Sequence, residues 1–201
     1  MTTIIPLVRD LIQDNLVKCA PEIHEYLSSK VFTLSEANIS SATLLVYKNG
    51  TLFTSGNYSF STDTNKVTVT GTLAVGDVLE FRYSAYKKYS DDELEGFIKS
   101  SLYHISVFKY GDFLIGSGDV ILYGAIATTV RQQRMIAMIA SILIDGGIAN
   151  YHTPDISINF TEKESKEVRI KRIVETYRTR YGVFDYHPFE STPDAWTPSE
   201  E

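Results

Sequence analysis

Residues 83–105 read "YSAYKKYSDDELEGFIKSSLYHI", and the period of the hydrophobic pattern changes within this stretch. In its first part, which continues from Val78, apolar and polar side chains alternate as they do in a half-buried strand. After Ser90, apolar side chains recur every three or four residues, which predicts an amphipathic helix. A series of strands that leads directly into helices predicts a fold of the α+β class.

An acidic group, Ser90-Asp91-Asp92-Glu93, lies where the period changes. Serine followed three residues later by glutamate is the pattern of a capping box, in which each side chain accepts a hydrogen bond from the other residue's backbone amide. Asp91 and Asp92 then fall in the first helical turn, where the helix dipole stabilises negative charge. The alternative is an acid–base site made by Asp91, Asp92 and His104, which would need a cleft and shifted pKa values. We predict a structural helix cap and no catalytic residue.

The residues before this group, 31–87, predict an inserted small antiparallel sheet or sandwich. In "VYKNGTLF", Asn49-Gly50 is a strong hairpin signal because both residues tolerate positive φ. "KVTVTG" and "VLEFRYSAY" alternate like strands, and Gly76-Asp77 marks a turn between them. We expect four or five short strands.

Helical patterns flank the β insertion, and we expect residues 1–30 and 88–181 to form one helical core. Val8 to Cys19 follows a helical spacing. Pro21 is suited to the first turn of a second helix, which would continue to about Ser29. Residues 161–180 predict a charged helix.

Residues 120–144 predict one long helix, or two in close succession, that ends in "MIAMIASILI". This apolar run is much shorter than the roughly 20 residues that a membrane span needs. Because it is apolar almost all round, we expect other helices to surround it. The side chains expected to be buried there are Met135, Ile136, Met138, Ile139, Ile142 and Leu143.

The last twenty residues, 182–201, contain no Lys or Arg, five acidic residues and three of the six prolines, yet they keep four large aromatic side chains. Such an extended tail suits docking on a partner or a neighbouring subunit, and an unstructured terminus is the alternative. The predicted interface residues are Phe184, Tyr186, Phe189 and Trp196 in the tail, with Arg169, Arg172 and Tyr177 in the charged helix.

Composition argues against several functional classes. The formal net charge of −6 disfavours general affinity for nucleic acid, and the mixed charges of helix 161–180 favour a solvated or interface helix over a DNA reader. A single cysteine, Cys19, and four histidines in different predicted elements give no metal-binding pattern. "GSGD" at 116–119 lacks the remaining residues of a phosphate-binding loop, so no cofactor is predicted. The N-terminus has no signal-peptide pattern.

The order of these features resembles that of structural proteins of tailed bacteriophages, in particular head–tail connector proteins, also called adaptor or head-completion proteins. The resemblance rests on "VYKNGTLFTSGNYSF", "NKVTVTG" and "GDVLEFRYSAY", followed at once by "KYSDDELEGFIKSSLYHI". Its sharpest part is "YSDDELEGFIKSSL", which is similar to the capped entry to a connector helix. Helical bundles of that family carry a β insertion, and their C-terminal tail docks onto the portal or a neighbouring subunit.

The resemblance implies a non-enzymatic virion protein made in the host cytoplasm and located at the neck, where the head meets the tail. It implies a homo-oligomeric ring of twelve copies between the portal protein and a tail-side neck protein, with no membrane contact. DNA would pass through the ring without sequence-specific binding, and a negative net charge is compatible with a wall to which DNA does not adhere. The alternative is a tail, baseplate or fibre component that binds a host or virion partner, which the β portion alone would also suit.

Overall fold

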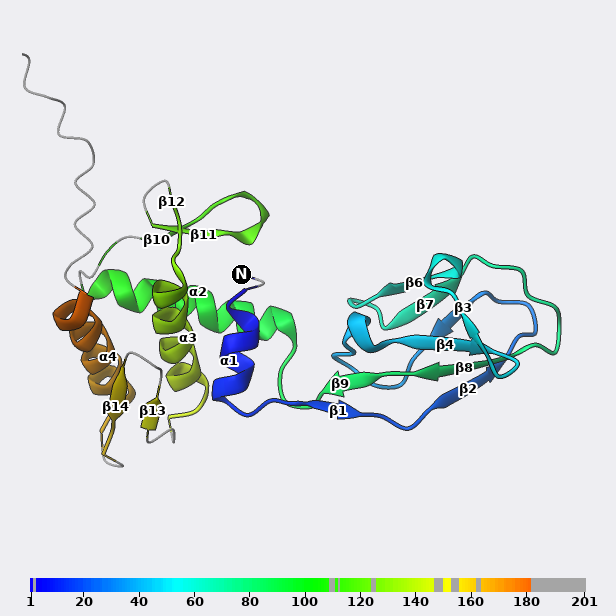
Figure 1. Ribbon diagram of the computed structural model, residues 1–201, viewed down its shortest axis with the longest axis horizontal. Helices are drawn as coiled ribbons and strands as arrows, with labels where there is room; N and C mark the ends of the chain where they lie inside the picture. Colours follow the sequence, from blue (N-terminus) through cyan, green and yellow to red (C-terminus); the bar gives the residue numbers. More distant parts are fainter. Residues whose placement is uncertain are drawn as a thin grey trace, which may run out of the picture. The chain divides into compact units, whose positions relative to one another are not determined.

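The structure, a computed structural model, describes residues 1, 3–108, 111, 113–123, 126–146, 150–152, 156–161 and 164–181 (Figure 1). The chain divides into two compact units: a helical unit formed by Met1–Ile12 and Glu95–Glu201, and a β unit formed by Gln13–Leu94. The described residues contain four α-helices and several small antiparallel sheets, so the predicted α+β class is confirmed. In sequence, the β unit is an insertion that follows α1 (Ile5–Leu11).

Two antiparallel sheets supply most strands of the β unit. The larger sheet has the order β2 (Glu22–Glu25), β8 (Val78–Arg82), β4 (Leu45–Lys48), β5 (Thr51–Phe53). The smaller sheet has the order β3 (Val31–Thr33), β7 (Lys66–Val69), β6 (Tyr58–Ser61). A separate pair joins β1 (Leu16–Lys18) to β9 (Ser84–Tyr86), and two 3-10 turns, η1 (Ser41–Thr43) and η2 (Ser55–Asn57), connect strands.

The alternation seen in the sequence places one side of each sheet in a shared core. Val67 and Val69 of β7 and Leu79 and Phe81 of β8 are buried, whereas the residues between them are partly or fully exposed. Residues of both sheets therefore belong to one hydrophobic cluster, which consists of Phe32, Leu34, Ile39, Leu44, Val46, Val67, Val69, Leu79, Phe81, Tyr83 and Ala85.

The β4–β5 hairpin turns at Asn49-Gly50, as the sequence predicted. Their φ angles are +50° and +78°, and the flanking residues Lys48 and Thr51 pair across the two strands. A turn of this kind needs positive φ at both central residues, which asparagine and glycine adopt at low cost.

The helices expected between Val8 and Ser29 are wrong beyond α1. Helix α1 ends at Leu11, because Gln13 adopts a φ of +53° that a right-handed helix cannot contain. The residues that follow instead form β1 and β2, which pair with β9 and β8. Helical spacing in this stretch was overridden by tertiary strand pairing, so the β portion begins at Gln13 and not at residue 31.

The helical unit contains the other helices and two small sheets. These elements are α2 (Asp91–Val107), β10 (Phe113–Ile115), η3 (Ser117–Asp119), β11 (Ile121–Tyr123), β12 (Ile126–Ala127), α3 (Val130–Ile144), β13 (Asn150–His152), β14 (Ser157–Asn159) and α4 (Lys166–Tyr181). Helix α3 packs against α1 and α4 and lies between them (Figure 1). The unit boundary at Leu94/Glu95 falls within α2.

Two helix starts were predicted too early. Residues 121–123 and 126–127, expected to be helical, form strands in the antiparallel sheet β10-β11-β12. Helix α3 begins only at Val130, where Thr129 and Gln132 form a capping box. The charged helix begins at Lys166 and not at residue 161. The apolar residues ahead of α3 form strands instead of a helix. In a short apolar run, side-chain periodicity does not distinguish a strand from a helix.

Candidate functional site

The acidic group at the start of α2 is a helix cap. The Ser90 amide donates to Glu93 Oε2 at 2.8 Å, and the Glu93 amide donates to Ser90 Oγ at 3.2 Å. The amide and hydroxyl of Ser90 lower the pKa of the Glu93 carboxyl, because both hydrogen bonds favour its ionised form. Asp91 and Asp92 are exposed in the first turn, close to the positive end of the helix dipole.

The residues of the alternative acid–base site are not brought together. Asp92 and His104 lie on the same helix, twelve residues apart, which corresponds to about 18 Å along the axis. A general acid and base that act on one substrate need hydrogen-bond reach of the same atoms. The separation therefore gives these residues no common reaction centre.

Helix α3 is buried almost all round by its own chain. Its fully buried apolar side chains include Met135, Ile136, Met138, Ile139 and Ile142, whereas Leu143 is only half-buried. The helix packs against α1 and α4, so its burial does not depend on a neighbouring copy.

Arg169 and Tyr177, which were predicted to lie at an interface, are both buried in their own unit. Arg169 is 3% exposed, and its guanidinium donates to the carbonyls of Gly146 and Thr161 and lies over the Phe160 ring. Tyr177 is 2% exposed, and its hydroxyl contacts the Met138 sulfur at 4.0 Å. Charge density along the sequence does not show which face of a helix is covered.

Arg172 is also engaged within the chain. Its guanidinium forms an ion pair with Glu164 at 2.6 Å and donates to the Asn159 carbonyl at 2.9 Å. The remaining predicted interface residues, Phe184, Tyr186, Phe189 and Trp196, lie outside the described residues.

An exposed apolar sheet, β10-β11-β12, is the surface feature that the sequence analysis missed. Phe113 and Ile121 turn inward and are buried, whereas Leu114 is 59% exposed and Ile126 is 70% exposed. The N-terminal amine of Met1 donates to the Asp119 carbonyl, which ties the hairpin tip to the start of the chain. The sequence analysis predicted no strand in "FLIGSGDVILY", although its apolar residues on both sides of "GSGD" are a hairpin signal.

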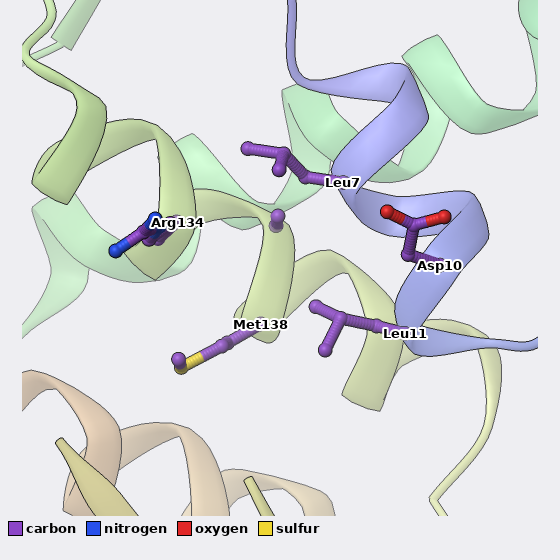
Figure 2. A pocket seen from close by; sticks show the side chains of 6 residues that line it. Leu7, Asp10, Leu11, Arg134 and Met138 are labelled. Carbon is purple, nitrogen blue, oxygen red and sulfur yellow. The ribbon is translucent and has the colours of Figure 1, made fainter. Parts of the chain in front are cut away.

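A recess of about 180 Å³ lies between α1 and α3 (Figure 2). Its apolar walls come from Leu7 and Leu11 of α1 and from Met138 of α3, next to Ala137. Two charged side chains, Asp10 and Arg134, stand at its rim, and no hydrogen bond or ion pair of either side chain occurs within the described part of the chain.

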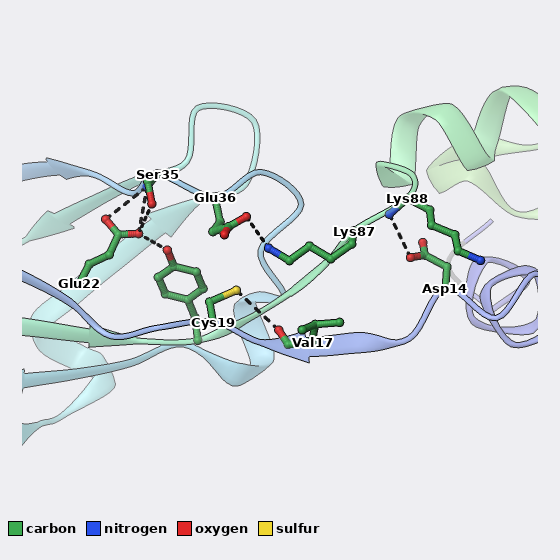
Figure 3. Close-up of polar contacts among 9 residues, drawn as sticks. Asp14, Val17, Cys19, Glu22, Ser35, Glu36, Lys87 and Lys88 are labelled. Atoms are coloured by element: carbon green, nitrogen blue, oxygen red, sulfur yellow. Dashed lines mark hydrogen bonds and ion pairs between the residues drawn. The ribbon is translucent and has the colours of Figure 1, made fainter.

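The β unit contains a polar cluster that joins its strands (Figure 3). Glu22 accepts hydrogen bonds from the Ser35 amide at 3.0 Å, the Ser35 hydroxyl at 2.8 Å and the Tyr83 hydroxyl. Burial opposes ionisation of Glu22, but these donors outweigh it and lower its pKa. Burial, and then the bond to Glu22, raise the pKa of Tyr83 above its ordinary value. The cluster stabilises the ionised carboxylate, which is a structural role.

The outer face of the larger sheet carries one continuous row of side chains. The register places Ile23, Glu80, Tyr47 and Leu52 beside one another across four strands. Ile23 is 69% exposed and Leu52 is 54% exposed. Between them, the Arg82 guanidinium lies 4.5 Å from the centre of the Tyr47 ring and pairs with Glu80 at 2.6 Å.

The described part of the chain shows neither a metal-binding cluster nor a membrane-spanning helix. No group of three His, Cys, Asp or Glu residues lies close enough there to hold a metal ion. None of the helices in the described ranges has the length and apolar character that a membrane span requires. No protein-family model matches the chain, and no curated protein sequence matches it either.

Proposed function

We propose that this protein is a structural virion protein: a head–tail connector subunit of a tailed bacteriophage. In this proposal the helical unit is a bundle that assembles into a ring, the β unit is a sandwich inserted into it, and residues 182–201 form an extended tail. The ring of twelve copies joins the portal to a tail-side neck protein and passes DNA through its lumen. The insertion of the β unit after α1 supports the proposal, because connector proteins carry a β insertion in a helical bundle.

The exposed apolar sheet β10-β11-β12 is the observation that carries the assembly role. Leu114 and Ile126 are both exposed, although the register places them on opposite faces of the sheet, and Val120 and Val130 are also exposed. Several exposed apolar residues gathered on one small element mark an interaction site more often than single scattered ones do. A ring uses such a surface in heterologous contacts, in which it meets a different surface of the next copy.

Introduction of a charge on this sheet tests the proposal. Native mass spectrometry of the purified chain, alone and with the portal protein of the same virion, should show a ring for the wild type. Leu114→Glu should abolish the ring, while Ile23→Glu, a matched change of an exposed aliphatic residue in the β unit, should keep it. A wild-type chain that stays monomeric with every virion partner, and is absent from purified virions, would refute the connector role.

A tail, baseplate or fibre component with a ligand-binding β module is the second candidate. The row Ile23–Glu80–Tyr47–Leu52 favours it, because exposed aliphatic and tyrosine side chains are typical of contact surfaces. The same two variants separate the candidates. Loss of host attachment by intact particles that carry Ile23→Glu supports the ligand-binding role, and failure of head–tail joining in Leu114→Glu supports the connector role.

A further inference from the structure

The recess between α1 and α3 has the dimensions of a site for one large side chain. Its volume of about 180 Å³ is smaller than the roughly 300–1,000 Å³ of pockets that bind drug-sized molecules. Leu7, Leu11 and Met138 offer apolar walls, and Arg134 offers a positive charge at the rim. An occupant that satisfies both features is an apolar or aromatic side chain with a carboxylate beside it.

The described chain ends against α3, the helix that forms one wall of this recess. Tyr181, the last residue of α4, lies under the guanidinium of Arg131, with 4.7 Å between the guanidinium carbon and the ring centre. Arg131, Arg134 and Met138 are spaced three and four residues apart on α3, so they form one stripe along that helix. The stripe leads from the end of α4 to the recess.

The distance along α3 from Arg131 to Met138 indicates which part of residues 182–201 can reach the recess. Met138 follows Arg131 by seven residues, which is about 10 Å along the helix axis. Three residues of extended chain also span about 10 Å. Phe184 is three residues beyond Tyr181 and Asp185 is next to it, so the length of extended chain suffices for an aromatic ring and a carboxylate to reach the apolar walls and Arg134.

Charge complementarity favours this occupant. Residues 182–201 contain five acidic residues and no Lys or Arg, and Arg134 has no ion-pair partner within the described residues. Asp10, on the α1 side, repels a carboxylate and so restricts the pairing to the Arg134 side of the rim.

We propose that the recess between α1 and α3 binds residues 183–186 of the same chain. The Phe184 ring fills the space between Leu7, Leu11 and Met138, and the Asp185 carboxylate pairs with Arg134. This anchor leaves the distal aromatic residues Phe189 and Trp196 for contact with a partner. The anchor belongs to the single chain and does not depend on the connector role.

Tryptophan fluorescence tests whether the ring is buried. Trp196 is the only tryptophan, so Phe184→Trp in a Trp196→Phe background reports on position 184 alone. We expect emission at a shorter wavelength than in the urea-unfolded chain. Adding Arg134→Glu should move the emission to the longer wavelength of an exposed indole, whereas Arg134→Lys should preserve the short wavelength. Solvent-like emission in the folded reporter, or no response to Arg134→Glu, would overturn the proposal.

Disulfide trapping tests whether the occupant is the same chain. In a Cys19→Ser background, Leu7→Cys with Phe184→Cys should form an intrachain disulfide, visible as a faster-migrating monomer on a non-reducing gel. The control pairs Phe184→Cys with Ser100→Cys, an exposed position on α2 in the same unit, and should remain reduced under the same conditions. Covalent dimers from the Leu7 pair would assign the recess to the tail of another copy. Equal trapping in the control would show that the tail does not dock there.

Discussion

Ser90 and Glu93 exchange hydrogen bonds at the start of α2, at 2.8 and 3.2 Å between each backbone nitrogen and the side-chain oxygen of the other residue. These bonds satisfy two of the backbone amides that a helix N-terminus otherwise leaves without partners. The acidic sequence that invited a catalytic interpretation is therefore part of the helix boundary.

Removing the cap should cost measurable stability. We expect Ser90→Ala to lower the free energy of unfolding by about 1 kcal/mol in urea denaturation, because the Glu93 amide loses its acceptor. Asp92→Asn is the control: Asp92 is exposed in the first turn of the helix, near the positive end of the dipole, so about 0.5 kcal/mol or less is expected. A cost for Asp92→Asn equal to that of Ser90→Ala would contradict the capping interpretation.

The burial of Ile139 leads us to expect a large loss of stability when its side chain is shortened. Ile139 is fully buried in α3, so Ile139→Ala should lower the unfolding free energy of the isolated subunit by about 3 kcal/mol. Val130→Ala, at a position 61% exposed on the same helix, should change it by less than about 0.5 kcal/mol. If Ile139→Ala weakened only the assembled protein, neighbouring copies and not α1 and α4 would be covering the helix.

Tyr151 should make the helical unit sensitive to alkali. Burial raises the pKa of Tyr151 from 10.0 to about 12, and its hydroxyl bonds to Ser141 and donates to the Met138 carbonyl. Because the folded-state pKa is the higher one, the neutral hydroxyl contributes stability that is complete below pH 10 and is lost as the pH rises towards 12. The loss should be about 2 kcal/mol.

Thermal melts between pH 9 and pH 12, at about half-unit steps across the range where tyrosine titrates, measure this dependence. Tyr151→Phe should flatten it, at a cost of about 1 kcal/mol at neutral pH for the lost hydrogen bonds. Tyr103→Phe, a change at an exposed residue, should keep the wild-type dependence. An unchanged slope in Tyr151→Phe would show that other groups cause the alkaline loss.

Asp77 should make the β unit sensitive to acid. The Ala74 amide donates to its carboxylate at 2.6 Å, the Asn49 side chain donates at 2.8 Å, and the Lys48 ammonium lies at 3.0 Å. These contacts lower the pKa of Asp77 from 3.8 to about 2. Since the folded-state pKa is the lower one, the contribution to stability is present above 3.8 and is lost as the pH falls towards about 2.

Circular dichroism melts of the full chain across this acid range measure the effect. Asp77→Asn should reduce the acid dependence of the β-unit transition, because the variant has no carboxylate to protonate. Asp63→Asn, at an exposed aspartate in the same unit, should leave that dependence as in the wild type. Equal flattening by both variants would assign the dependence to general charge and not to the Asp77 contacts.

The sequence predicted those features that depend on a single short segment. The Asn49-Gly50 turn, the Ser90–Glu93 cap and the apolar stripe of α2 were all predicted, because each depends on residues within a few positions of one another. The burial of five of the α3 side chains followed from their continuous apolar run.

Partners distant in sequence decided the rest. Residues 22–25, predicted to be helical because Pro21 suits a first helical turn, pair with β8, more than fifty positions later. Residues 121–123 pair with β10 and with residues 126–127. Arg169 was predicted to lie at an interface, but in the structure its guanidinium contacts the carbonyls of Gly146 and Thr161 and the Phe160 ring. The sequence by itself determined turns, caps and the α+β class, whereas only the tertiary structure decided strand pairing, burial and the recess between α1 and α3. Side-chain periodicity indicates which residues are buried, but it does not indicate which distant segment packs against them.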